Sequence, residues 1–236
     1  MAEMGLGYGS EFQLMRFLGH HRNYLNRIIQ NSLNNEGTIE WLDFPVNDNR
    51  CSGDGEWRGI KCFEGNIDNY NDIKAKWEKF WPQTGSSMNW DGVFKIGDTW
   101  FFVEAKAHRE ESFQKCSASS VASIELIKKS LNDTQRWLEA TSPTILKTQA
   151  DWLDSNCYQL ANRLAFLYFC NQCGIKAKLV YIGFVNGYRR KKDEVLSVDG
   201  WMKIWEEEME ILGLDIKEMS PYISFVHPDC VNPQIV

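Results

Sequence analysis

Residues 89–108, NWDGVFKIGDTWFFVEAKAH, constrain the fold of this chain more than any other segment. They are mostly aromatic and β-branched, which is typical of strands that pack in a core. Gly97-Asp98 interrupts them at the centre, and Gly-Asp favours a two-residue hairpin turn. With this turn, Ile96 faces Thr99, and the numbers of every directly opposed pair add up to 195. We therefore predict an antiparallel hairpin with one fixed register.

This register gathers three ionisable side chains on one face of the hairpin. Asp91 lies directly opposite Glu104, with Cβ atoms about 4.5–5.5 Å apart, and the two-residue period of a strand puts Lys106 on the same face. Two opposed carboxylates destabilise a strand pair unless their charge is compensated. A Mg²⁺ ion, which prefers oxygen ligands, is one candidate for this compensation, and Lys106 alone is the other. Apolar residues dominate both faces, so we expect the sheet to be covered on both sides.

The pattern of Asp91 followed, after twelve intervening residues, by Glu104-Ala105-Lys106 resembles the signature of the PD-(D/E)xK nuclease superfamily. In that signature an Asp near one strand precedes an acidic-x-Lys triplet on the next strand. Trp90 stands where the family name has Pro, a position that varies in the family. The resemblance implies an α/β fold with a restriction-endonuclease-like core, in which a mixed central sheet carries helices on both faces.

The order of elements in that core is helix, three strands, helix, strand, and the sequence can be laid on it. We expect the first helix at 10–33, with Ser10 as N-cap, the first strand at 38–44, and the second and third strands in the hairpin 90–107. The second helix is expected at 151–173, with Gly174 at its end, and the last strand at 178–184. The whole chain, 1–236, is then one nuclease-like domain. Segments outside the core are insertions at about 47–88 and 109–150 and a C-terminal extension at 187–236. In these we expect an irregular loop at 47–72, helices at 74–81, 118–140 and 199–212, and a late edge strand at 222–227.

The resemblance also implies roles for the hairpin residues. Asp91 and Glu104 are the expected metal ligands, joined by the carbonyl of Ala105. Lys106 would hold the attacking water and offset phosphate charge. A lysine flanked by carboxylates stays charged more readily, which favours this role over that of a general base.

Further candidates lie outside the hairpin, and each has a plainer explanation. Glu11 would be an additional metal ligand, although a helix dipole also favours an acid in the first turn. Gln159 and Arg163, one helical turn apart, would face the active site, or else form a solvated face. Arg189 and Arg190, in an RRKK run, would contact phosphate, or else form a solvated turn.

The composition limits the partners. The net charge is −6, which argues against strong non-specific binding of nucleic acid but does not exclude a nuclease. Seven cysteines without framework spacing indicate reduced thiols. No secretory segment or run of membrane-spanning length is visible, so we expect a cytoplasmic protein with no membrane partner.

These observations lead to an expected function. It is a metal-dependent nuclease that hydrolyses phosphodiester bonds, with DNA as substrate and Mg²⁺ as cofactor, for which Mn²⁺ substitutes. A homodimer is one arrangement for such an enzyme when it cuts both strands. The alternatives are a catalytically silent binding or assembly module with the same fold, and an unrelated α/β protein. The choices between DNA and RNA and between endo- and exonuclease stay open.

Overall fold

A mixed five-stranded sheet forms the centre of the computed structural model, which describes residues 9–43, 56–84, 88–187, 195 and 197–233. The strand order is β1-β4-β5-β6-β7. The first three of these strands are antiparallel, whereas β6 and β7 continue the sheet in parallel with β5. The strands are β1 (Glu40–Trp41), β4 (Gly92–Ile96), β5 (Thr99–Lys106), β6 (Ala177–Gly183) and β7 (Ile223–Val226).

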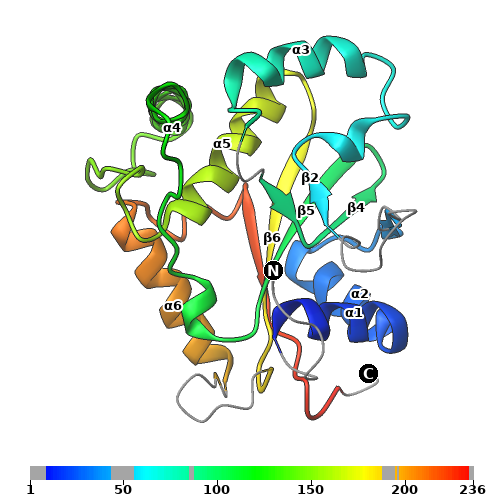
Figure 1. Ribbon diagram of the computed structural model, residues 1–236. Helices are drawn as coiled ribbons and strands as arrows, with labels where there is room; N and C mark the ends of the chain where they lie inside the picture. The colour runs from blue at the N-terminus through cyan, green and yellow to red at the C-terminus, as the bar shows by residue number, and fades with distance from the viewer. Residues whose placement is uncertain (1–8, 44–55, 85–87, 188–194, 196, 234–236) are drawn as a thin grey trace.

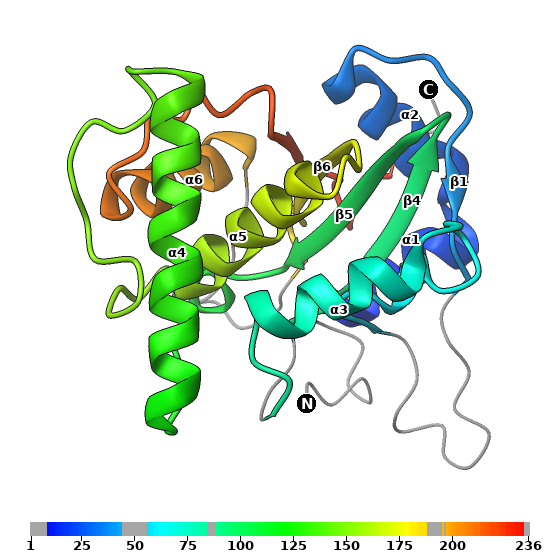
Figure 2. The ribbon, with the colours of Figure 1, turned by 90° about the horizontal axis from the view of Figure 1, so that it is seen from above.

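Helices cover both faces of this sheet, as the sequence predicts (Figures 1 and 2). One face packs against α1 (Ser10–His20) and α2 (Arg22–Leu33). The other face packs against α3 (Tyr70–Phe80), α4 (Val121–Thr141), α5 (Tyr158–Gln172) and α6 (Val198–Ile211). A second sheet pairs β2 (Trp57–Arg58) with β3 (Asn89–Trp90), and two short 3₁₀ helices span Lys61–Phe63 and Arg109–Glu111. The α/β class with a mixed sheet is therefore confirmed.

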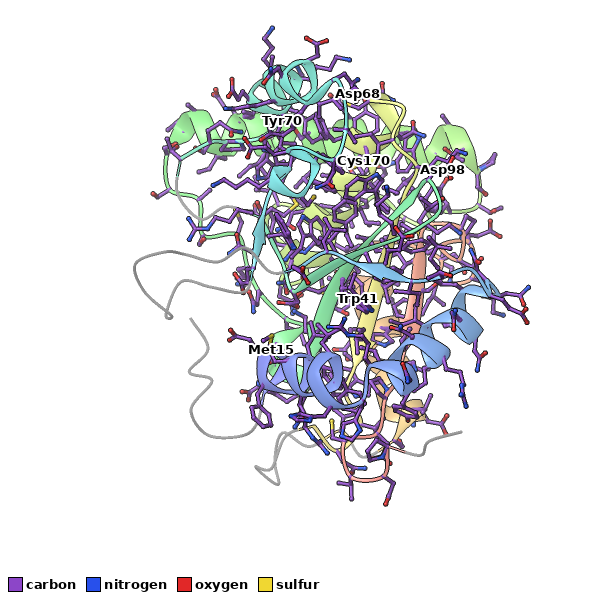
Figure 3. The ribbon with its side chains drawn as sticks, turned by 90° about the vertical axis from the view of Figure 1, so that its right-hand side faces the viewer. Met15, Trp41, Asp68, Tyr70, Asp98 and Cys170 are labelled. Atoms are coloured by element: carbon purple, nitrogen blue, oxygen red, sulfur yellow. The ribbon has the colours of Figure 1, made fainter. Side chains whose placement is uncertain are left out.

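The β4–β5 hairpin has the predicted register from Gly92 to Ile96, but the ladder ends there and does not include the predicted pair of Asp91 with Glu104. Gly92 pairs with Val103 at one end, and Ile96 pairs with Thr99 at the turn. Gly97 adopts a φ of 60° in the turn, a conformation that strains every residue with a side chain. Asp98, the other turn residue, is labelled in Figure 3. The turn therefore fixes which residues of β4 and β5 lie opposite each other.

The helix predicted over 10–33 is divided in two, so this prediction is wrong in its continuity. His21 separates α1 from α2, with a φ of −130° and a ψ of 29° that leave the helical region. The Nε atom of Arg22 donates to the carbonyl oxygen of Leu18 (2.9 Å), which has lost its backbone donor at the break. Gly19, two residues before the break, lowers the helix propensity there.

Two predicted helix starts also differ from the structure. Ser10 is the first residue of α1, and the N-cap is Gly9. The helix predicted over 151–173 begins only at Tyr158. The cause is local, because the Asp151 carboxylate accepts hydrogen bonds from the N–H groups of the second and third residues after it (3.0 and 3.2 Å). This turn competes with the first turns of a helix.

The predicted insertions contribute to the core. α3 and α4 bury Ile73, Trp77, Ile127, Leu131 and Leu138 against the sheet face that carries α5. The segment 47–72, predicted as an irregular loop, contains β2 and a 3₁₀ helix among its described residues. The strand predicted over 38–44 is reduced to β1, and residue 44 lies outside the described residues.

Candidate functional site

A cleft of about 540 Å³ opens beside the start of the hairpin. Its walls come from β3, from the segment after α3, from residues 114–120 and from the first turns of α4 and α5. Asp91, Glu104, Gln159 and Arg163 all line it. Four of the residues predicted for the site, from three separate parts of the chain, therefore meet in one cleft.

Asp91 lies at the bend between β3 and β4, one residue before the paired ladder begins. Its N–H donates to the carbonyl oxygen of Val103 (3.1 Å), and its Oδ2 atom accepts the N–H of Ala105 (2.6 Å). The side chain thus occupies the hydrogen-bonding position that a continued β4 strand would have used on β5. This contact turns the Asp91 carboxylate towards the part of β5 that carries Glu104.

Glu104 is 2% exposed, and donors surround its carboxylate. Its Oε1 atom accepts hydrogen bonds from Lys106 and from Gln159 Nε2 (2.8 Å). Its Oε2 atom accepts Arg163 Nε (2.7 Å) and forms an ion pair with an Arg163 Nη atom (2.6 Å). The Lys106–Glu104 ion pair was the alternative that the sequence left open, and the structure contains it.

Lys106 is 4% exposed and is joined to the cleft through its neighbours. Besides its contact with Glu104, its Nζ atom donates to Gln159 Oε1 (2.7 Å). Gln159 therefore bridges the two groups, because its amide nitrogen donates to Glu104 and its amide oxygen accepts from Lys106. The side chains of Gln159 and Arg163 point inward from α5 and do not form a solvated face.

The electrostatics of the site follow from burial and from these ion pairs. Desolvation, with a further contribution from the nearby Glu104 carboxylate, raises the pKa of Asp91 to about 8. Burial also opposes the charge on Glu104, but Arg163 and Lys106 outweigh it and hold its pKa below the ordinary value. For Lys106, Glu104 and Asp91 outweigh burial and raise the pKa. Lys106 and Glu104 are therefore ionised at neutral pH, whereas Asp91 holds its proton more tightly than an exposed aspartate does.

Sequence reasoning missed a second buried acid on the same side of the sheet. Glu208 of α6 is 2% exposed, and burial raises its pKa to about 8, with Lys106 and Glu104 among the charges it senses. Its Oε2 atom and the hydroxyl of the buried Tyr181 have no hydrogen-bond partner among the described residues. The signal was present, because Glu208 continues the i, i+4, i+7 spacing of the buried Trp201 and Trp205.

One predicted residue, Glu11, does not line the cleft, and two others lie outside the described residues. Glu11 is half-buried on α1, and the described lining of the cleft does not include it. Burial raises the pKa of Glu11, and Glu56 at the cleft adds to the effect. Arg189 and Arg190 lie outside the described residues, so their contact with phosphate stays a prediction.

The donor set suits a hard cation that keeps water ligands. Within the described ranges, no group of three or more His, Cys, Asp or Glu side chains could hold a metal ion. Asp91 and Glu104 supply carboxylates at one cleft, and Mg²⁺ is commonly bound by one or two carboxylates together with waters and substrate phosphates. The residues present therefore fit Mg²⁺ but would not form a closed, all-protein metal cage.

The fold and site together define an α/β protein with a mixed sheet and a polar cleft at its hairpin. Comparison of the chain with protein-family models, with curated proteins and with solved structures gave no match. Of the helices in the described ranges, none has both the length and the apolar character that crossing a bilayer requires.

Proposed function

We propose that this protein is a metal-dependent nuclease with a restriction-endonuclease-like core that hydrolyses phosphodiester bonds in DNA. The observation that carries the proposal is the meeting of Asp91 and Glu104 in one cleft, with Lys106 bonded to Glu104. These are the residue types, in the chain order, that the PD-(D/E)xK resemblance requires.

The topology supports the proposal. Helices α1 and α2 precede the antiparallel strands β1, β4 and β5, and α5 then leads to β6, which is parallel to β5. When the β2–β3 sheet, α3 and α4 are set aside as insertions, this order of helix, three strands, helix and strand is the one expected for the family core. The acidic-x-Lys triplet lies on the third of these strands, at the end next to the cleft.

Each residue has a distinct task in the proposed chemistry. Asp91 and Glu104, with the carbonyl of Ala105, would hold Mg²⁺ or Mn²⁺. The bound ion would act as a Lewis acid and supply an activated water. Lys106, kept cationic by Glu104 and Asp91, would orient the water and offset phosphate charge. Gln159 holds Lys106 and Glu104 in register through its two amide contacts.

A second candidate is a binding or assembly module that has the same fold and performs no catalysis. It is favoured by the contacts of Glu104, whose carboxylate is fully occupied by Lys106, Gln159 and Arg163. In that case Glu104, Lys106 and Arg163 would form a network with a purely structural role. The nuclease and the silent module differ in whether a metal ion and a phosphodiester enter the cleft.

A digestion panel with Mg²⁺ separates the two. Labelled single-stranded, duplex and branched DNA and RNA are incubated with the wild-type protein and with Lys106→Ala. We expect the wild-type protein to cleave at least one DNA and the variant to lose about 100-fold or more of that rate. Equal background cleavage by both proteins would contradict the nuclease proposal. The panel also tests the expected DNA preference, and light scattering of the same samples tests the expected homodimer.

A further inference from the structure

Arg163 is the most constrained side chain of the cleft. Besides Glu104, it contacts the backbone carbonyl of Asn89 (2.7 Å) and Oδ1 of Asn162 (2.9 Å). Its guanidinium carbon lies 4.6 Å from the centre of the Trp90 ring. These partners come from β3, β5 and α5, so they hold the guanidinium in place from several directions.

The contacts of Arg163 leave it few donors for a phosphate. The side chain is 5% exposed, and each of its three nitrogens already donates to a protein oxygen. Of the five N–H groups of a guanidinium, three donate to these oxygens, and one Nη atom also pairs with Glu104, which leaves little capacity for a ligand. Its charge, however, still acts on anything that enters the cleft, because the buried guanidinium is only weakly screened by water.

Acidic and basic side chains are equal in number at the cleft among the described residues. The charged side chains that line it are the acids Glu56, Asp91 and Glu104 and the bases Lys115 and Arg163, and Lys106 adds a third base next to Glu104. Three acids thus face three bases among the described residues, so the cleft has no net negative charge even when all three acids are ionised. A divalent cation that enters alone meets no net negative charge, and it must also compete with Arg163 for Glu104. A phosphodiester that enters with the cation supplies the missing negative charge.

We infer that Arg163 is a built-in counter-cation that makes metal binding at Asp91 and Glu104 depend on the phosphate of the substrate. This inference rests on the proposed function and extends it to the order of assembly. Arg163 is a positioning residue, since it acts through Glu104 and touches neither metal nor substrate. Metal and substrate affinities must then be coupled, and by linkage each raises the other by the same factor.

The test is the affinity for Mn²⁺, measured by electron paramagnetic resonance of the free ion. The wild-type protein is titrated alone, with a phosphorothioate oligodeoxynucleotide that resists hydrolysis, and with an uncharged methylphosphonate oligomer of the same sequence. The variants are Arg163→Gln, Arg163→Lys and the control Arg136→Gln, which alters an exposed arginine on α4. Circular dichroism checks that each variant is folded.

We expect the charged oligomer to raise the Mn²⁺ affinity of the wild-type protein by about tenfold or more, and the uncharged oligomer to have no effect. Arg163→Gln should bind Mn²⁺ without an oligomer at least about fivefold more tightly than the wild-type protein. Arg163→Lys retains the charge, and we expect it to behave as the wild-type protein and the control do.

Two results would overturn the inference that Arg163 acts as a counter-cation. One is a wild-type Mn²⁺ affinity that the charged oligomer leaves unchanged, which decides the matter even if Arg163→Gln does not fold. The other is a folded Arg163→Gln protein that binds Mn²⁺ no more tightly than the wild-type protein. Absence of Mn²⁺ binding by every protein under all conditions would overturn the proposed function itself.

Discussion

Replacing Glu104 by alanine tests whether the buried network holds the site together. The substitution leaves Lys106 and Arg163, 4% exposed each, without their shared carboxylate. Removing one partner of a buried ion pair costs about 3–5 kcal/mol, because it leaves uncompensated charge in the interior. For a chain of this length such a loss lowers the melting temperature by roughly 6–20 °C.

The assay is urea unfolding followed by tryptophan fluorescence, in buffer with a chelator so that no metal contributes. The matched control is Glu207→Ala, which removes the partner of Arg109 in an ion pair whose side chains are 42% and 49% exposed. Such exposed pairs contribute about 0–1 kcal/mol. If Glu104→Ala loses no more free energy of unfolding than the Glu207→Ala control, the claim that the buried network holds the site together is refuted. A gain in stability would indicate that Glu104 is held under repulsion in the metal-free protein.

Two further predictions concern the pH dependence of stability at Glu208 and the packing at Gly183. Because the folded-state pKa of Glu208 is raised to about 8, the folded state holds a proton that the unfolded state releases, so stability falls as pH rises from about 4.5 to about 8. In urea unfolding, the free energy of unfolding should fall less between pH 5 and pH 8 in Glu208→Gln than in Glu207→Gln. An equal fall in the two variants would contradict the raised pKa of Glu208. At Gly183 a Cβ atom would lie 2.6 Å from the Trp201 ring, whereas at Gly19 it would meet nothing within 4 Å. Gly183→Ala should therefore lose about 1–3 kcal/mol, and Gly19→Ala should gain up to about 1 kcal/mol; equal thermal stability of the two variants would show that the packing argument is wrong.

The hairpin was predictable because its information is local. Gly97-Asp98 selects the turn, and the strand period then determines which residues face each other. Glu104 and Lys106 follow on one face for the same reason. The end of the ladder at Gly92 was not predictable, because it depends on β3 leaving β4 to pair with β2.

The partners of Glu104 lie beyond what local patterns can give. The spacing of Gln159 and Arg163 shows only that they share a helix face. Their contact with Glu104 spans 55 and 59 residues of sequence and depends on how α5 packs on the sheet. Glu208 differs from them, because its place in a buried helical stripe was readable from the sequence. The start of α5 was misjudged because the carboxylate of Asp151 forms its own turn.

Mn²⁺ binding to Asp91→Asn, in the presence of the phosphorothioate oligodeoxynucleotide, tests the central claim most directly. An asparagine can still accept the N–H of Ala105 through its Oδ1 atom, so the hairpin contact is retained while the carboxylate is lost. We predict that the variant binds Mn²⁺ at least about tenfold more weakly than the wild-type protein, with Glu207→Gln unchanged. Equal Mn²⁺ affinity in Asp91→Asn and the wild-type protein would contradict a metal site at Asp91 and Glu104.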